Sequence, residues 1–290
     1  MSNTHLNKEN SKIDKQNPLG ESVDYIDQYM PSLLFPIPRV DKREEIGISG
    51  KLPFHGVDMW NAYELGWLNS KGLPQVAIAE FYIPANSPNI IESKSFKLYL
   101  NSLNQTRFDD PQALSETLQN DLSKTVGCGI KVIIRTVDCE SEFGVLEGKC
   151  IDDQDIEITQ YDYQPDLLST LSNSQSDKHS LAEVVTESLY SHLLKSNCLI
   201  TNQPDWGSVL IQYKGIKICH ESLLRYLVSF RTHNEFHEQC VERIFTDIQR
   251  YCQPEELTVY ARYTRRGGLD INPWRSNCAK MMDNIRLSRQ

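Results

Sequence analysis

Two distant segments of this chain share one pattern of apolar and polar residues, and their separation constrains the fold. Residues 92–110, ESKSFKLYLNSLNQTRFDD, return in altered form at 219–238 as CHESLLRYLVSFRTHNEFHE. With one residue of slack, the paired positions are Tyr99-Leu100 with Tyr226-Leu227, Ser102 with Ser229, and Phe108 with Phe236. Solenoid repeats recur every few dozen residues, so a period this long predicts a duplicated domain. Chance similarity of two amphipathic segments is the alternative.

The two copies differ mainly at polar positions. Glu92-Ser93-Lys94 of the first copy stands where the second has Cys219-His220-Glu221, and His237-Glu238 of the second stands where the first has Asp109-Asp110. Copies that keep their apolar residues and diverge at polar ones indicate that each retains half of one shared site. This hypothesis predicts that Glu92 and Glu238 face a common cavity with Cys198.

Composition excludes several classes of protein. With 290 residues, 39% hydrophobic and 24% charged, the chain matches an ordinary globular protein of one large or two medium domains. A formal net charge of −9 argues against general nucleic-acid binding. No apolar run approaches the roughly 18–20 residues that span a bilayer. The polar N-terminus lacks the apolar core of a secretory signal, so we expect a flexible tail over 1–18 and a cytoplasmic location.

The cysteines indicate neither a disulfide framework nor a metal site. All eight are scattered, at positions 128, 139, 150, 198, 219, 240, 252 and 278. Structural zinc sites usually contain closely paired cysteines, and no C-x-x-C pair is present. In a chain without a signal peptide most such cysteines are reduced and buried. We therefore expect no bound metal.

Local patterns predict strands and helices in the same order in each half. In the first half we expect strands at 75–83, 131–137 and about 144–151, a loop at 86–89, and a helix at 115–126 with Ser115 as its N-cap and Gly127 at its end. In the second we expect a helix from Ser180, its N-cap, to about Leu194, strands at 208–213 and 257–264, and two helices between 221 and 251 broken near 232–234. Gly267-Gly268 forces a turn.

This order predicts the fold class and the domain limits. Strand, helices and strand in each half, without a βαβ rhythm or a G-x-G-x-x-G motif, favour an α+β fold with antiparallel sheets over a Rossmann domain. The stretch 151–179 contains seven acids within 151–177 and is otherwise rich in small polar residues. It is typical of a linker. The predicted domains are therefore 19–150 and 180–290, joined by the acidic linker 151–179.

Cys198 and Asp205 are the residues best suited to covalent chemistry. They lie seven positions apart, in NCLITNQPDW, where we expect a loop that directly follows a helix. A nucleophilic thiol has to lose its proton, which a neighbouring carboxylate disfavours electrostatically but can accept as a base. Asp205 therefore suits a role as base or as proton donor to an intermediate. From residue type alone, any of the eight cysteines could serve.

Other polar residues are ambiguous when each is considered alone. Adjacent helical residues point about 100° apart, so His237 and Glu238 share a face only at the start of a helix. Taken singly, this pair and Glu92 are typical of solvated surface, although a buried Glu would suit a ligand with neighbouring N–H donors, such as a guanine-like edge. The candidate phosphate contacts are cationic: Lys94, Lys97, Arg265 and Arg266, the last two preceding exposed glycine backbone.

Four motifs together resemble one family, the NADPH-dependent 7-cyano-7-deazaguanine reductases of queuosine biosynthesis, in their long two-domain form. These motifs are ESKSFK at 92–97, NCLITNQPDW at 197–206, FHE at 236–238 and YTRRGG at 263–268. The resemblance spans the chain from about residue 18 to its C-terminal end. It implies two tandem tunnelling-fold domains, each an antiparallel sheet that carries a pair of helices, and by analogy a homodimer.

The resemblance also implies a reaction and its residues. Cys198 would attack the nitrile carbon of 7-cyano-7-deazaguanine to form a covalent thioimide, Asp205 would supply protons, and two NADPH would yield 7-aminomethyl-7-deazaguanine. Ile91, Glu92, Ser93, His237 and Glu238 would bind the small-molecule substrate, whereas Ser93, Lys94, Arg266 and Gly267 would bind NADPH. Whether His237 also relays protons stays open. No nucleic acid, membrane or metal is implied.

Three alternatives were weighed against this reaction. A thiol-dependent hydrolase of a purine-like substrate could form the same thioimide and then react with water, although the arginines at 265–266 favour a phosphate-bearing cofactor. A zinc-dependent hydrolase of the same fold is disfavoured, because no Cys/His pair lies at ligand spacing near Cys198. A non-catalytic binding duplicate is also disfavoured, since binding alone requires neither Cys198 nor Asp205.

Overall fold

The computed structural model describes residues 25–138, 143–171 and 183–290 of the chain. The tail expected at 1–18, Cys139 and the predicted N-cap Ser180 lie outside these residues. Within the described ranges the strands are β1 (Pro36–Pro38), β2 (His55–Leu68), β3 (Pro74–Pro84), β4 (Asn89–Ile91), β5 (Lys131–Arg135), β6 (Lys149–Cys150), β7 (Val184–Ser191), β8 (Lys195–Asn197), β9 (Pro204–Ile216), β10 (Glu256–Tyr263) and β11 (Leu269–Ser276).

The helices occur as two pairs and several short turns. The α-helices are α2 (Arg39–Glu44), α3 (Ser93–Asn101), α4 (Pro111–Val126), α5 (His220–Val228) and α6 (His237–Tyr251), and the 3-10 turns are η1 (Pro31–Leu33), η2 (Pro165–Leu167) and η3 (Ser229–Thr232). No helix in the described ranges is long and apolar enough to cross a membrane.

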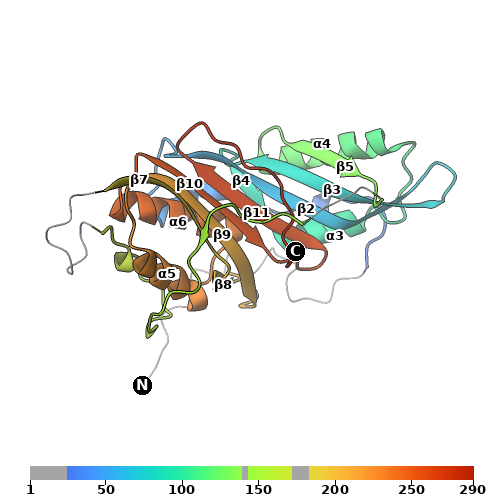
Figure 1. Cartoon of the computed structure of the whole chain (residues 1–290). Coiled ribbons are helices and arrows are strands. Elements are labelled where there is room, and N and C mark those ends of the chain that lie inside the picture. The colour runs from blue at the N-terminus through green and yellow to red at the C-terminus, as the bar shows by residue number, and fades with distance from the viewer. Residues whose placement is uncertain (1–24, 139–142, 172–182) are drawn as a thin grey trace, which may run out of the picture.

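One nine-stranded sheet runs the length of the molecule, with α3 and α4 at one end and α5 and α6 at the other (Figure 1). Its strand order is β5-β3-β2-β11-β10-β9-β7-β6, with β8 paired to β9 beside this path. All pairs are antiparallel except β6 with β7. The halves join where β11 pairs with β2 over eight residues. The prediction of an α+β protein with antiparallel sheets is thus confirmed.

Two hydrophobic clusters pack the helix pairs against the sheet. In the first, leucines of α4 spaced four apart, Leu114, Leu118 and Leu122, are fully buried together with Phe96 of α3. In the second, α5 and α6 contribute most of their apolar residues. A third cluster, with Trp274 and Leu287 among its members, lies under the segment that follows β11. Burying these faces is the main stabilising contribution to the fold.

The repeat seen in the sequence recurs as matched hydrogen bonds. In the first half, Asp121 of α4 accepts hydrogen bonds from the hydroxyls of Tyr29 and Tyr99, both at 2.7 Å. In the second, Asp247 of α6 accepts from Tyr163 at 2.7 Å and Tyr226 at 2.6 Å. The hydroxyls of two serine pairs also accept equivalent backbone N–H groups: Ser95 and Ser222, and Ser102 and Ser229. Chance similarity does not explain bonds conserved at this many places.

The structure also corrects the alignment of the repeat. Asp121 and Asp247 are 126 residues apart, and so are the first residues of α4 and α6, Pro111 and His237. Phe236 therefore corresponds to Asp110 rather than to Phe108, and Glu238 corresponds to Gln112. The apolar match that the sequence suggested is displaced by two residues at this point.

Most predicted elements are present, with shifted limits. The strands expected at 75–83, 131–137, 208–213 and 257–264 correspond to β3, β5, β9 and β10, and α5 and α6 are separated near the expected break. The expected loop at 86–89 ends earlier, because β4 begins at Asn89. Helix α4 begins at Pro111, since Asp110 caps it by accepting from Ala113 N. Ser115 lies inside the helix. The strand expected at 144–151 is reduced to β6.

The helix expected at 180–194 is wrong over its described part. Residues 184–191 instead form β7, which pairs with β9 from Val184↔Ile216 to Ser191↔Val209. The segment VVTESLYS is rich in β-branched and aromatic residues, and pairing with a long neighbouring strand decides the structure of such a sequence. Sequence patterns also missed β2 and β11, the strands that join the two halves.

The acidic stretch packs against the second half along its described length. Ile151 and Leu168 are buried in the second cluster, and Ile156, Ile158 and Tyr163 pack against it. The segment around η2 is bonded to α5 in the way that residues 29–35 are bonded to α3. Residues 151–171 are therefore ordered against α5 and α6, whereas 172–179 lie outside the described residues. The positions at which the chain divides into domains stay a prediction.

Candidate active site

A single cavity of about 650 Å³ collects residues from both halves of the chain. Its walls include Ile91, Glu92, Ser93 and Lys94 from the first half, and Cys198, Asp205, His237, Glu238, Arg266 and Gly267 from the second. These are all the residues to which the resemblance assigns a role in catalysis or in binding. The geometric prediction that Glu92, Glu238 and Cys198 share one cavity is confirmed.

The β8–β9 hairpin accounts for the spacing between Cys198 and Asp205. Cys198 directly follows β8, not a helix as expected, and its backbone N–H donates to Gln203 O at 2.8 Å. The chain turns through Asn202, whose φ of 55° is left-handed, a conformation that asparagine adopts more readily than most residues. In β9, Asp205 then pairs with Ser196. The hairpin therefore returns the carboxylate to the neighbourhood of the sulfur.

Asp205 is held as a carboxylate between two positively polarised groups. Its side chain contacts the guanidinium of Arg266, and its Oδ2 lies 3.3 Å from Nε2 of His237. Burial alone would raise the pKa of Asp205, but hydrogen bonding and charge from His237 and Arg266 outweigh burial and lower that pKa. In this arrangement Asp205 is suited to accept a proton.

Arg266 connects the catalytic candidates to the mouth of the cavity. Besides Asp205, its guanidinium donates to Thr201 Oγ1 at 3.2 Å and Gln203 Oε1 at 3.1 Å, and the Cys198 thiol is a further partner. Burial opposes the charge, but Asp205 and Cys198 raise the pKa of Arg266 overall. Gly267 and Gly268, with φ of 58° and 78°, form the two-residue turn that presents Arg266.

Glu92 is buried because it begins helix α3. β4 leads into it, and its carboxylate accepts from Lys94 N at 2.9 Å and Ser95 N at 2.7 Å, which caps the helix. Burial raises the pKa of Glu92, and these two N–H groups partly oppose that rise. The expectation that Glu92, taken singly, lies on the solvated surface is therefore wrong.

His237 and Glu238 form the first turn of α6, the one place where adjacent helical residues can face the same cavity. The His237 ring stacks on Tyr263, with centroids 3.8 Å apart and planes 2° apart. Glu238 is only 4% exposed. Burial and then the charge of Asp58 raise the pKa of Glu238 to about 7, against the opposing influence of Arg39 and His237. An exposed helical pair, the alternative from sequence, is excluded.

The four cationic candidates do not behave alike. Lys94, Lys97 and Arg266 line the cavity, and Lys97 also forms an ion pair with Glu64. Arg265 instead lies over the Tyr63 ring, 4.4 Å from its centroid, and donates to Gln290 O at 3.2 Å. In an antiparallel hairpin, successive residues point to opposite faces, so Arg265 and Arg266 separate. Of the four candidates, Arg265 is the one that does not line the cavity.

Several lining residues escaped sequence reasoning. Thr201, Gln203, Glu235, Phe236 and Thr264 contribute to the cavity wall. Four of the five lie within the motifs already named and Glu235 directly precedes one, so membership of a motif or proximity to it was the available signal. Among the described residues, no group of three or more His, Cys, Asp or Glu side chains could hold a metal ion.

The cavity can bind a planar polar ligand and carry out covalent chemistry on it. Two buried carboxylates, one from each half, suit a ligand edge with several N–H donors. The thiol lies beside a base and a cation, and three cationic side chains can contact an anionic cofactor. A thiol, a carboxylate and cationic side chains in one cavity are the set of groups expected in the active site of an enzyme that uses covalent catalysis.

Comparison with known proteins assigns the chain to a family. Residues 25–134 match the model described as nitrile reductase, 7-cyano-7-deazaguanine-reductase N-term, and residues 204–282 match the model QueF-like protein. Two curated relatives are both named NADPH-dependent 7-cyano-7-deazaguanine reductase. One, from Hydrogenovibrio crunogenus, is 54% identical over 98% of this chain and 100% of its own, and one from Chromobacterium violaceum is 57% identical over 95% and 97%.

The chain is thus a nitrile reductase homologue by its N-terminal match. More narrowly, it belongs to the NADPH-dependent 7-cyano-7-deazaguanine reductase family, and the resemblance carried by its motifs is confirmed. Among solved structures, the archaeosine synthase QueF-Like in the apo form covers 35% of this chain and 99% of its own, at 16% identity and a TM-score of 0.30. That likeness is too weak to bear on the fold.

Proposed function

We propose that this protein reduces the nitrile of 7-cyano-7-deazaguanine to the primary amine, 7-aminomethyl-7-deazaguanine, with NADPH as the reductant, in queuosine biosynthesis. The observation that carries the proposal is the shared cavity. It joins a thiol, a paired carboxylate and two buried glutamates from different halves of a chain whose full-length relatives bear this name.

In the first step the Cys198 sulfur attacks the nitrile carbon. A C–S bond forms, one C–N π bond breaks, and the thiol proton passes through Asp205 to the nitrogen, which gives a thioimide. The lowered pKa keeps Asp205 ionised, so a carboxylate oxygen is available to accept the thiol proton. Splitting a difficult reduction over a covalent intermediate is the usual gain from a nucleophile.

Reduction then consumes two hydrides and two protons. The first hydride and a proton convert the thioimide to a tetrahedral adduct. Its C–S bond then breaks, one N–H proton returns to the sulfur, and the Cys198 thiol and an imine result. A second hydride and proton give the amine, so one nitrile consumes two NADPH and two protons. Because His237 lies 3.3 Å from Asp205, it is suited to return protons to that carboxylate.

The walls of the cavity divide between substrate and cofactor. Ile91, Glu92, Ser93, His237 and Glu238 hold the deazaguanine, with a carboxylate from each half at its N–H edge. Ser93, Lys94, Arg266 and Gly267 hold NADPH, which supplies hydride, and Lys97 adds a cation next to them. Enclosure protects the imine from water.

The same proposal covers architecture and assembly. Each half comprises antiparallel strands, two helices and further strands, which supports two tandem tunnelling-fold domains that divide near 19–150 and 180–290. We propose a cytoplasmic homodimer whose partners are small molecules rather than nucleic acid.

Turnover and mass spectrometry test the function together. Purified protein with 7-cyano-7-deazaguanine is expected to oxidise two NADPH per amine formed. Without NADPH it is expected to gain the mass of the nitrile on Cys198, and Cys198→Ala is expected to lose both. Cys219→Ala, which alters a cysteine outside the cavity, is the matched control. An adduct without NADPH oxidation would favour the thiol hydrolase, and the absence of both would refute the proposal.

A further inference from the structure

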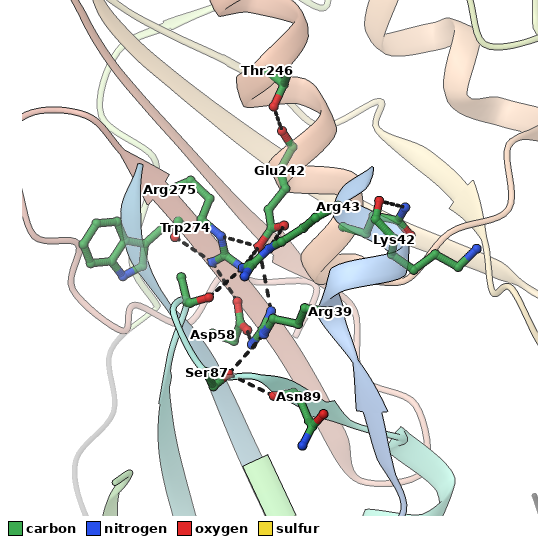
Figure 2. A network of polar contacts seen from close by, with 12 residues as sticks. Arg39, Lys42, Arg43, Asp58, Ser87, Asn89, Glu242, Thr246, Trp274 and Arg275 are labelled. Carbon is green, nitrogen blue, oxygen red and sulfur yellow. Dashed lines mark hydrogen bonds and ion pairs between the residues drawn. The ribbon is translucent and has the colours of Figure 1, made fainter. Parts of the chain in front are cut away.

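Behind the substrate side of the cavity lies a buried network of five charged side chains, shown in Figure 2. Arg275 bridges two carboxylates, with contacts of 2.8 Å to both Asp58 and Glu242. Arg39 pairs with Asp58 at 2.5 Å, and Arg43 pairs with Glu242 at 2.7 Å. All five are buried. The network joins α2 and β2 of the first half to α6 and β11 of the second.

The network lies directly behind Glu238. Glu242 follows Glu238 by four residues on α6, so the two carboxylates lie on one face of the helix. Both carboxylates and Arg39 line a small cavity of about 20 Å³, whose walls also include Phe236 and Ile90. These two residues and Glu238 also line the candidate active site. Arg39 and the substrate thus approach Glu238 from opposite sides.

Charge within the network is unbalanced. Three guanidinium groups, Arg39, Arg43 and Arg275, face two carboxylates, Asp58 and Glu242, which leaves one positive charge in excess. Burying an uncompensated charge is costly. Within the described part of the chain, no side chain donates a hydrogen bond to the Glu238 carboxylate. An ionised Glu238 would neutralise the excess charge and still be able to accept hydrogen bonds from a ligand.

We propose that Arg39 is a positioning residue that keeps Glu238 ionised, so that Glu238 can accept the N–H donors of the deazaguanine. This inference rests on the proposed function for the identity of the ligand. Arg39 contacts Asp58 and faces Glu238 across the small cavity. Of Arg39 and Glu238, only Glu238 contacts the substrate.

The charged residues that line the small cavity together with Glu238 are Arg39, Lys42, Arg43 and Glu242. Burial and Asp58 raise the pKa of Glu238, while Arg39 and His237 lower it, and the balance lies at about 7. The charged groups on the ligand side are Glu92, Lys94, Lys97, Asp205, Glu235 and Arg266. Because the balance lies near neutrality, loss of Arg39, the far-side cation that lowers this pKa, shifts Glu238 toward its protonated form.

The test is substrate affinity as a function of pH, measured without NADPH in the Cys198→Ala background so that binding alone is observed. Relative to that parent, Arg39→Met is expected to bind 7-cyano-7-deazaguanine about fivefold more weakly at pH 7, as a rise of about one pKa unit from about 7 would produce. The ratio should approach one as the pH rises toward 9. Dividing by the parent at each pH removes the ligand's own titration. Arg39→Lys, which retains the charge, should restore most of the affinity.

Arg43→Met is the matched control. It removes one guanidinium from the same network and the same small helix, but Arg43 pairs with Glu242 and Ala85 O rather than with Asp58. Its affinity ratio is expected to stay constant with pH. A constant ratio for Arg39→Met, or the same pH profile for both variants, would overturn the inference.

A ligand-free measurement separates this inference from the proposed function. The unfolding free energy of Arg39→Met as a function of pH should contain the Glu238 titration at a higher pH than wild type does, and adding Glu238→Gln should remove that difference. If the nitrile fails to bind the parent protein while this shift is present, only the proposed function fails. If the shift is missing, the inference fails.

Discussion

The two halves of this chain share a frame and differ at the ends of their helices. Tyr99 and Tyr226 each bind an aspartate of the following long helix, Asp121 or Asp247. At the first helix of each pair, however, Glu92 caps α3 with its carboxylate, whereas Cys219 at the same position of α5 makes no side-chain cap. Packing was preserved where the core requires it, and chemistry diverged where the chain enters a helix.

The second helices show the opposite specialisation. Asp110 caps α4 and leaves its first turn exposed, while Phe236 gives α6 no side-chain cap and its first turn lines the cavity. The first half therefore contributes the start of α3, and the second contributes the start of α6 and the β8–β9 hairpin. The shared cavity exists because each copy lost the half that the other retained.

The largest expected effect comes from replacing the residue at the N-cap position of each first helix by alanine. Glu92→Ala is expected to lower kcat/KM by about 10³-fold, since a buried ligand donor loses its acceptor and the start of α3 loses its cap. Cys219→Ala, at the equivalent position, should change kcat/KM less than about twofold. Steady-state kinetics with matched circular dichroism spectra measure both. Equal losses would mean that the two helix starts are not specialised.

A second contrast concerns stability and pH at the equivalent positions Glu238 and Gln112. The pKa of Glu238 is raised from 4.5 to about 7. Between these values the folded protein binds more protons than the unfolded chain, so Glu238 makes stability fall as pH rises through this window. Relative to Glu238→Gln, wild type should lose up to roughly 3 kcal/mol of unfolding free energy between pH 4.5 and 7.

Gln112→Glu is the control for that experiment. It places a carboxylate at the matching, exposed position of α4, where solvent keeps the pKa ordinary and no such fall is expected. Urea denaturation across the pH range gives the difference between each variant and wild type. If wild type and Glu238→Gln run parallel, Glu238 is not the group that titrates.

The turn between β10 and β11 provides a third contrast, between adjacent arginines. Arg266→Met is expected to raise the KM for NADPH about 30-fold, close to 2 kcal/mol, because it removes a cation from the cavity. Arg265→Met, on the opposite face of the hairpin, should change that KM less than about threefold. Fluorescence titration with NADPH in the Cys198→Ala background checks that binding, rather than chemistry, is altered. A larger effect at Arg265 would reverse the assignment of the two faces.

Local pattern predicted what local forces determine. The alternation of apolar and polar residues predicted β3, and Gly127 predicted the end of α4. The repeat predicted that both halves contribute to one cavity. The failures occurred where distant pairing decides. Val184–Ser191 became a strand because β9 provides a partner, and Arg39 gained a role only through β2 and α6, which lie beside it in the folded chain. No spacing within the sequence carries that information.

The smallest effect tests the shared frame itself. Asp121→Asn and Asp247→Asn each weaken the acceptor of two tyrosine hydroxyls, at a cost of about 1–2 kcal/mol apiece. The two halves make the same tyrosine–aspartate hydrogen bonds but differ in how far these residues are buried. Asp247 and Tyr226 are buried, whereas Asp121 and Tyr29 are more exposed. Water can replace the lost bonds at Asp121 more readily, so the second half should lose more stability than the first.

Burial also has an effect that reduces the stability loss expected for Asp247→Asn. It raises the pKa of Asp247, which marks its charge as partly unfavourable in the folded protein, and the neutral Asn avoids that cost. The two variants should therefore differ most below pH 5, where Asp247 is protonated more readily and donates as well as accepts, and converge toward pH 8. Urea midpoints at both pH values measure the difference. A larger loss at Asp121 would show that the first half, not the second, depends more on its tyrosine–aspartate bonds.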